Sequence, residues 1–309
     1  MFELVFLGTA AAAPSAERGS PALLIARAPA RFLVDCGEGT QRQLMRARLG
    51  FRGLGHVLLT HLHLDHVAGL AGLLATRQLF QLDDAIELVG SRETVAFARR
   101  YLSATIGTER EAGYRLRAVS PGLVLSRPGW RLSAVPVAHR ATESLGYLFE
   151  EEARRALLPG RLDGLGVPEG PERAVLARGL PVVLADGRSV TPEMVQGPDV
   201  SGAKLAIIGD VEEVASLVEP VRRADALVIE ATFLERDAAL ARSRGHLPAA
   251  AAARLACEAE IGELLLTHIS GRYQAAEILA EASAVFPRVR VATDFDRVSV
   301  TAHFPPPPR

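Results

Sequence analysis

Thr60-His61-Leu62-His63-Leu64-Asp65-His66 is the stretch of this sequence that decides its interpretation. The segment before it, from His56 to Leu59, is expected to form a buried strand, and a helical pattern follows it. Side chains alternate along an extended chain, so His61 and His63 are expected to face the same way, and the turn into the helix can bring Asp65 and His66 nearby. Imidazole nitrogens and carboxylate oxygens are the ligands that zinc takes at about 2.0–2.2 Å. The stretch therefore predicts a metal site.

The competing interpretation is a polar strand end with solvated histidines. It is disfavoured, because four such groups packed together repel one another when protonated and gain nothing from apolar packing.

Three further metal-compatible residues, His139, Asp210 and His268, each follow an apolar run. The carboxyl ends of buried strands are where α/β folds gather their sites. Any one of the three taken alone fits a capping or core role equally well. Together with the first four residues they form a set of seven ligands, enough for two metal ions that share one carboxylate.

Apolar strand-like runs alternate with helical patterns along the chain, which predicts an α/β class with sheets covered by helices. The spacing predicts a helix from Val67 to Phe80 and another from Glu93 to Tyr101. The expected strands are Glu3–Leu7, Ala22–Ile25, Arg31–Val34, Ala85–Gly90, Lys204–Asp210, Ala226–Glu230, Glu263–Thr267 and Arg288–Ala292.

The segment from Arg154 to Pro198 breaks this rhythm with closely spaced prolines and glycines. Closely spaced prolines and glycines in mid-chain indicate a segment that leaves the core, as an arm, lid or long loop, rather than a linker between domains.

The composition is that of a folded chain of ordinary charge. Its 309 residues are 49% hydrophobic and 23% charged, with a net charge of −1, which excludes a disordered or collagen-like protein. A near-zero charge argues against a chain coated with nucleic acid but allows a local basic patch. Lys204 is the only lysine, so a phosphate-binding surface here must be built from arginine.

Nothing in the sequence points to a membrane or to disulfide bonds. Cys36 and Cys257 are expected to be reduced thiols, although a single bridge between them would also fit the sequence. An acid stands near the N-terminus where a signal peptide would carry basic residues, and no apolar stretch approaches the roughly 18–20 residues of a membrane span. We expect a cytoplasmic protein.

The motif His-x-His-x-Asp-His, followed by a spaced His, Asp and His, resembles that of the metallo-β-lactamase-fold family. More narrowly, the chain is similar to ribonuclease Z, the tRNA 3′-processing endonuclease. The segments that carry this resemblance are Phe6-Leu-Gly-Thr9, Asp35-Cys-Gly-Glu-Gly-Thr-Gln41, Thr60–His66, Gly69-Leu-x-Gly-Leu-Leu74, Glu230-Ala-Thr-Phe233 and Thr267-His-x-Ser-x-Arg-Tyr273. The resemblance implies an αββα sandwich in one domain over residues 1–309, with an inserted arm over 154–198 that grips tRNA.

The resemblance also implies how the candidate residues act. One Zn²⁺ would be held by His61, His63 and His139, and a second by Asp65, His66 and His268, with Asp210 bridging; other divalent metals would also fit. Asp65 would accept a proton from the attacking water. His246, supported by Glu230, would protonate the leaving 3′ oxygen; the alternative for His246 is a solvated loop histidine.

The implied reaction removes the 3′ trailer from precursor tRNA and leaves a 3′ hydroxyl on the tRNA and a 5′ phosphate on the trailer. The family is typically a homodimer in which the arm of one subunit serves the site of the other. The arm of this chain carries arginines that could bind backbone phosphate, but acids lie among them, so a solvated loop with no RNA role is the alternative.

The chain departs from the family pattern outside the ligands. Ala16 and Gly19 replace a lysine and an asparagine in a loop that discriminates precursors by their 3′ end, which leaves open whether CCA-bearing precursors are cut. Near the proton-transfer residues the departures are Val211, Ile229, Leu247 and Pro248.

Two other functions fit parts of the sequence. One is a metallo-β-lactamase-fold phosphodiesterase or esterase acting on a small molecule, which would have no need of a basic arm. The other is a catalytically weak RNA-binding relative, which the intact set of seven ligands argues against.

Overall fold

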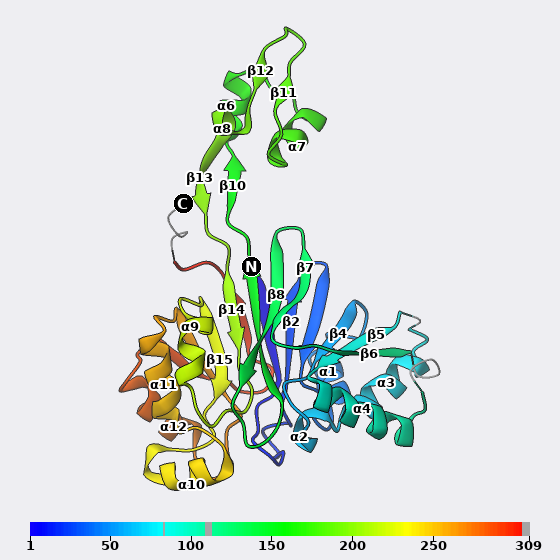
Figure 1. Ribbon diagram of the computed structural model, residues 1–309, viewed down its shortest axis with the longest axis vertical. Helices are drawn as coiled ribbons and strands as arrows, with labels where there is room; N and C mark the ends of the chain where they lie inside the picture. Colours follow the sequence, from blue (N-terminus) through cyan, green and yellow to red (C-terminus); the bar gives the residue numbers. More distant parts are fainter. Residues whose placement is uncertain (83, 109–112, 305–309) are drawn as a thin grey trace.

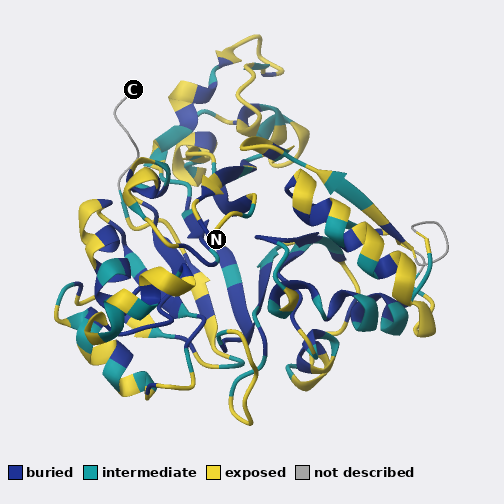
Figure 2. Cartoon of the chain, turned by 60° about the horizontal axis from the view of Figure 1, so that its bottom comes forward, coloured by how far each residue is buried: buried dark blue, intermediate teal, exposed yellow. Residues whose placement is uncertain are grey.

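The computed structural model describes residues 1–82, 84–108 and 113–304. Within these residues two seven-stranded mixed sheets lie against each other, and helices cover their outer faces (Figures 1 and 2). One buried cluster, which includes Phe6, Phe32 and Phe149, fills the space between the sheets. One further buried cluster lies between each sheet and the helices that cover it. These layers form the αββα sandwich that the resemblance implied.

The first sheet has the strand order β18-β1-β2-β3-β4-β5-β6, and β3 to β6 run parallel. Its strands are β1 Phe2–Gly8, β2 Ala22–Arg27, β3 Ala30–Val34, β4 Leu54–Leu58, β5 Ile86–Gly90, β6 Tyr114–Ala118 and β18 Arg297–Val300. Its helices are α1 Thr40–Arg46, α2 Leu64–Val67, α3 Leu70–Leu79 and α4 Arg92–Thr105.

The second sheet has the order β17-β16-β15-β14-β9-β8-β7, and β14 to β17 run parallel. Its strands are β7 Gly122–Arg127, β8 Trp130–Val137, β9 Ser144–Glu151, β14 Lys204–Ile207, β15 Ala226–Glu230, β16 Glu263–Thr267 and β17 Val289–Val291. The helical segments beside it are η1 Ala215–Leu217, α9 Val218–Val221, η2 Glu235–Asp237, α10 Ala238–Arg244, α11 Ala249–Glu258 and α12 Ala275–Ser283. The parallel strands place their carboxyl ends at one edge, where a site can form.

The single helix expected from Val67 to Phe80 is wrong in its start. α2 ends at Val67 and α3 begins at Leu70, because Gly69 donates its N–H to the Cys36 carbonyl at 2.8 Å instead of continuing the helix. A Cβ at Gly69 would lie 2.0 Å from the Gly37 carbonyl oxygen, so only glycine allows this close approach. The break fixes the short helix α2 against the turn that follows β3.

The arm predicted over 154–198 extends in the structure to Val200. Its stalk pairs β10 Arg154–Leu157 with β13 Gln196–Val200, and its head contains α6 Pro159–Gly164, α7 Pro171–Ala177, α8 Pro192–Val195, β11 Val182–Val183 and β12 Ser189–Val190. The head has a small core of its own, formed by Leu162, Val167, Leu176, Leu184, Val190 and Val195. The arm projects from one end of the body, and α2 lies at the opposite end (Figure 1).

Two further expectations concern the thiols and the membrane. Cys36 is buried and Cys257 exposed, and both are free. No helix in the described part of the chain is long and apolar enough to cross a membrane.

Candidate metal centre

The structure brings together all seven candidate ligands at the carboxyl ends of the strands. His61 and His63 follow β4, Asp65 and His66 lie in α2, His139 follows β8, Asp210 follows β14 and His268 follows β16. β4 ends at Leu58, so the two histidines expected at a strand end lie in the loop beyond it. His63 keeps an extended backbone, with φ −61° and ψ 146°, and both rings face the same point.

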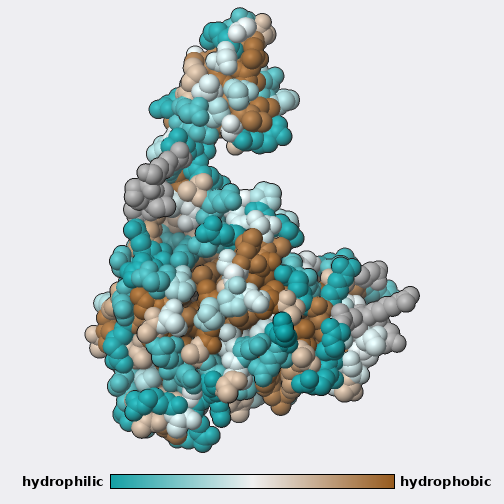
Figure 3. All heavy atoms as spheres, viewed as in Figure 1, coloured by the Kyte–Doolittle hydropathy of each residue, from teal (hydrophilic) through white to brown (hydrophobic). Residues whose placement is uncertain are grey.

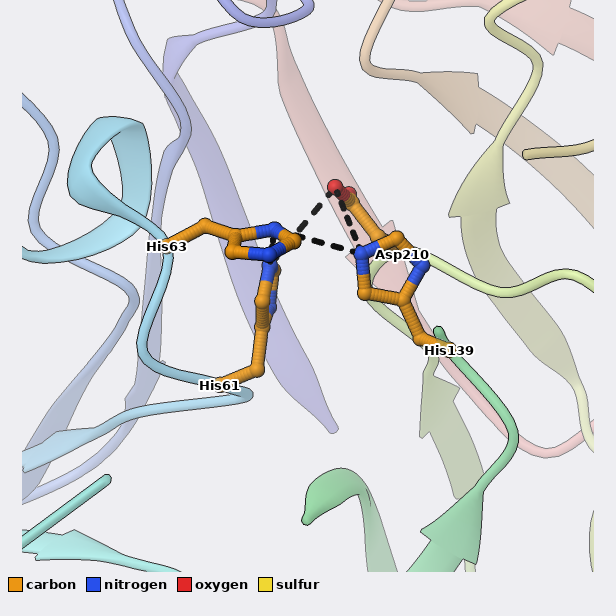
Figure 4. A group of neighbouring side chains, drawn as sticks. All are labelled: His61, His63, His139 and Asp210. Atoms are coloured by element: carbon orange, nitrogen blue, oxygen red, sulfur yellow. Dashed lines mark hydrogen bonds and ion pairs between the residues drawn. The ribbon is translucent and has the colours of Figure 1, made fainter. Parts of the chain in front are cut away.

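The first group contains His61, His63, His139 and Asp210 (Figure 4). The His63 Nδ1 atom lies 2.9 Å from His61 Nε2 and 3.2 Å from His139 Nε2. Asp210 Oδ2 lies 3.7 Å from His61 Nε2 and 3.9 Å from His139 Nε2. Tetrahedral ligands at zinc distances are about 3.3 Å apart, so the spacing of these four atoms suits one tetrahedral metal ion.

The second group uses the other oxygen of the same carboxylate. Asp210 Oδ1 lies 3.4 Å from His66 Nε2 and 3.3 Å from His268 Nε2. Asp65 Oδ2 lies 3.6 Å from His66 Nε2 and 3.5 Å from His268 Nε2. Asp210 therefore faces both ligand groups, one with each of its two oxygens.

Three buried atoms at this centre make no well-aligned hydrogen bond in the described chain, although the oxygen lies 3.3–3.4 Å from the two nitrogens: His66 Nε2, His268 Nε2 and Asp210 Oδ1. A buried polar atom without a partner costs free energy, so such atoms call for an explanation. All three point into the second group, and their nitrogen and oxygen chemistry suits a divalent metal ion. The residues present therefore fit the metal that the resemblance implied.

The ring nitrogens that face away from the centre are held by the protein. His66 Nδ1 contacts Asp35 Oδ2 at 2.7 Å, His139 Nδ1 contacts the Gly245 carbonyl at 2.8 Å, and His268 Nδ1 contacts the Thr232 hydroxyl at 2.9 Å. The Thr60 hydroxyl lies between His61 Nδ1 and the Asp35 carboxylate. Partners of this kind orient metal-binding imidazoles and fix their tautomers.

Asp35, Thr60 and Thr232 are site residues that sequence reasoning missed. All three lie inside segments that carry the family resemblance, and Asp35 has a left-handed backbone with φ +57°. Its carboxylate also accepts the Thr60 backbone N–H at 2.8 Å, which fixes the loop that carries His61 and His63. The sequence signal that could have found Asp35 is an acid directly after the apolar residues that end β3.

Charge within the centre follows from burial and close carboxylates. Burial holds the pKa of His61, His63 and His139 below the ordinary value, so these rings are neutral, which is the form that binds metal. Burial would also lower the pKa of His66, but Asp210 and Asp35 outweigh it and raise that pKa well above the usual range. A divalent cation in the second group would take the place of this proton.

Glu230 is a fully buried carboxylate behind the centre, and it holds His246. Its Oε1 atom lies 2.9 Å from His246 Nδ1 and accepts the Val211 N–H at 2.8 Å, while Oε2 accepts the Thr232 hydroxyl. Burial lowers the pKa of His246, but Glu230 outweighs burial and raises it to about 9. His246 is therefore held by Glu230 in a mostly buried position rather than left free in solvent.

The departures from the family pattern lie in two places. Val211, Ile229 and Leu247 are buried in the core between the second sheet and its helices, and Pro248 caps α11. Ala16 and Gly19 line a groove of about 580 Å³ together with Arg42 and Arg46 of α1. Val211, Ile229 and Leu247 pack within that apolar core, whereas a Cβ at Gly19 would lie only 3.1 Å from Gln43 Nε2 and 3.3 Å from Asp294 Oδ2.

Solved structures with this architecture include the metallo-β-lactamase-fold protein YhfI from Bacillus subtilis, with a TM-score of 0.68 and 19% identity over 96% of this chain and 98% of that one. The short form of human tRNase Z gives a TM-score of 0.66 and 25% identity over 96% and 99%. The fold and the clustered His and Asp side chains define a metal-dependent hydrolase of the metallo-β-lactamase fold.

Sequence comparison identifies the family within that class. A sequence profile described as "Anti-Pycsar protein Apyc1" matches residues 2–151. Ribonuclease Z of Bradyrhizobium diazoefficiens is 51% identical over 301 residues, covering 97% of this chain and all of that protein. Ribonuclease Z of Archaeoglobus fulgidus is 38% identical over 306 residues, covering 97% and 98%. The chain belongs to the ribonuclease Z family of endoribonucleases.

Proposed function

We propose that this protein removes the 3′ trailer from precursor tRNA, leaving a 3′ hydroxyl on the tRNA and a 5′ phosphate on the trailer. The observation that carries the proposal is the 51% identity to a ribonuclease Z over 97% of the chain. The match includes the arm, which a hydrolase of small molecules would not need. Because precursor tRNA is the proposed substrate, we propose the cytoplasm as the place of action.

The proposed cofactor is a pair of Zn²⁺ ions per subunit, with His61, His63 and His139 holding one, Asp65, His66 and His268 holding the other, and Asp210 holding both. When bound, two such ions supply a lowered pKa for the attacking water and stabilise charge on the phosphate oxygens. The ring nitrogens and the two Asp210 oxygens already face two points, which supports this count.

The proton transfers are assigned to residues of this chain. Burial would raise the pKa of Asp65, but His268 and His66 outweigh it, so the carboxylate is ionised and can accept a proton from the attacking water. His246 is held protonated by Glu230 and can donate its proton to the leaving 3′ oxygen. Metal ions in the centre would lower the pKa of His246 from about 9, because nearby positive charge disfavours imidazolium.

We propose that residues 1–309 form one domain and that the arm binds tRNA away from the cut. The structure sorts the arm's six arginines by their partners. Ion pairs with nearby aspartates hold Arg155, Arg173 and Arg188. Arg154, Arg161 and Arg178 have no carboxylate within ion-pair distance in the described chain, so they are the candidates for phosphate contacts.

The head also exposes apolar side chains, among them Leu180 and Val183 (Figure 3).

We expect deletion of the arm to raise KM for precursor tRNA much more than it changes turnover of a small phosphodiester. Arg154 and Val200 lie opposite each other in the stalk, so a two-residue link can replace residues 155–199. The head has its own core, so the body keeps its packing. Steady-state kinetics on both substrates measure the two effects, and equal losses on both would remove the RNA role of the arm.

We propose a homodimer in which the arm of one subunit serves the site of the other. The arm and α2 lie at opposite ends of the subunit, so the arm is poorly placed to serve its own site (Figure 1). Helices α1 to α3 and the residue after α3 also expose large apolar side chains, Met45, Leu64, Leu79 and Phe80, and Leu79 is 81% exposed. In the proposed dimer the partner subunit would cover these side chains.

Relative catalytic efficiency tests the proposed function against the small-molecule alternative. We expect kcat/KM of the zinc-loaded protein to be at least about 100-fold higher for a precursor tRNA than for a cyclic nucleotide, because the arm adds binding energy only for the larger substrate. Turnover of the cyclic nucleotide without cleavage of the precursor would replace the proposal with the alternative.

A further inference from the structure

Arg140 is an exposed arginine directly after His139, at the rim of the centre. No carboxylate in the described part of the chain lies within ion-pair distance of its guanidinium group. Its backbone N–H, by contrast, is engaged, donating to Glu212 Oε2 at 2.9 Å. The side chain therefore offers a free cation beside the proposed reaction site.

The backbone at Arg140 is fixed in an unusual conformation. Its φ of +50° lies in the left-handed region, which is disfavoured for an arginine. The conformation is maintained from both sides, because Glu212 donates its own N–H to the Ala138 carbonyl at 2.8 Å and the Thr142 hydroxyl donates to the His139 carbonyl at 2.9 Å. Strain held in this way is typical of residues that serve a functional site.

The stem of Arg140 lies against the loop that carries His246. A Cβ built on Gly245 would lie 2.6 Å from Arg140 Cγ, so the two residues pack closely. The Gly245 carbonyl accepts from His139 Nδ1 at 2.8 Å, and His246 follows it in the chain. Arg140 is therefore on the side of the centre where His246 donates its proton.

We propose that Arg140 binds a phosphate of the RNA backbone next to the one that is cut, on the side of the leaving 3′ oxygen. The proposal rests on the proposed function. The leaving oxygen belongs to the last nucleotide of the mature tRNA portion, so the neighbouring phosphate on this side is that nucleotide's own 5′ phosphate. A guanidinium group forms paired, charge-assisted hydrogen bonds with phosphate oxygens, and a lone arginine at a fixed position can thus set the register of the strand.

The test combines a protein variant with a substrate variant. Arg140→Met keeps the stem that packs on Gly245 and removes the charge, and a methylphosphonate at the 5′ phosphate of that nucleotide removes the charge of the proposed partner. Each change alone is expected to lower kcat/KM for a precursor tRNA about tenfold, the scale of one charged hydrogen bond. The two changes together are expected to cost little more than one, because they remove the same contact.

Arg115→Met, at an exposed arginine on the edge strand β6, is the matched control. In this variant the methylphosphonate should still cost about tenfold, as it does in the unaltered protein. If the methylphosphonate lowers kcat/KM of Arg140→Met by as much as it lowers that of the unaltered protein, so that the two losses multiply, the proposal is overturned. An equal loss on bis(4-nitrophenyl) phosphate, which has no neighbouring phosphate and reports on the support of the Gly245 loop, would overturn it too. Cleavage of the precursor by the unaltered protein tests the proposed function separately, and its absence would count against that function and not against Arg140 alone.

Discussion

Replacement of Asp65 with alanine is expected to abolish cleavage of precursor tRNA, with a loss of at least about 10³-fold in kcat, while precursor binding stays largely intact. The loss is large because the change removes both an oxygen that faces His66 and His268 and the group proposed to accept the proton of the attacking water. Binding is expected to survive because the proposed tRNA contacts of the arm lie at the other end of the subunit. Single-turnover cleavage and filter binding measure the two quantities.

Asp65→Asn separates the two roles of this residue. An asparagine keeps an oxygen that can bind metal but is a far weaker base, so metal content should be retained while kcat falls by about 10²–10⁴. Metal content is measured by mass spectrometry of the dialysed protein. Activity near that of the unaltered protein in either variant would contradict the assignment of Asp65 as the base.

His246→Ala is expected to lower kcat for precursor tRNA by about 10²–10⁴, the usual contribution of a positioned acid. The loss should depend on the leaving group. Bis(4-nitrophenyl) phosphate releases a weakly basic nitrophenolate that needs no proton, so its turnover should fall much less. Equal losses on both substrates would mean that His246 supports the centre without donating a proton.

The pH dependence gives a second view of the same residue. A proton donor acts below its pKa, so cleavage of precursor tRNA should fall as pH rises through the pKa of His246. Glu230 raises that pKa, and Glu230→Gln should therefore move the fall to lower pH, with metal content measured as the control. In His246→Ala the fall belonging to this group should be absent from the remaining activity. If the fall of activity at high pH is unchanged in both variants, it belongs to a group other than His246.

The seven clustered residues could be predicted from the sequence because four of them stand in one short motif after the strand β4, and His139, Asp210 and His268 each follow another apolar strand. Their division into two groups could not be read from spacing alone, since it depends on how the two oxygens of Asp210 face His61 and His66. The roles of Asp35 and Thr232 also depend on tertiary contacts. Each acts on a histidine more than 30 residues away in the chain.

Elsewhere the sequence pattern was overridden by contacts between distant segments. The helix expected from Val67 is interrupted because Gly69 donates to Cys36 across the loop after β3. In the arm, the positions of the arginines in the sequence do not show which of them form ion pairs. The ion pair of Arg155 with Asp199, for example, depends on the pairing of β10 with β13. Arg140 belongs to no motif recognised in the sequence, and its proposed contact with an RNA phosphate is inferred from its fixed backbone and its packing against Gly245.

The most direct test of the tRNA 3′-processing function is to map the ends produced by the zinc-loaded protein from two matched precursor tRNAs, one with an encoded CCA and one without. The proposed function predicts a cut directly after the discriminator nucleotide in the precursor that lacks CCA, with a 3′ hydroxyl on the tRNA and a 5′ phosphate on the trailer. The second precursor then shows the effect of Ala16 and Gly19 on CCA discrimination. Intact precursors in both reactions, with turnover of a small phosphodiester retained, would contradict the account.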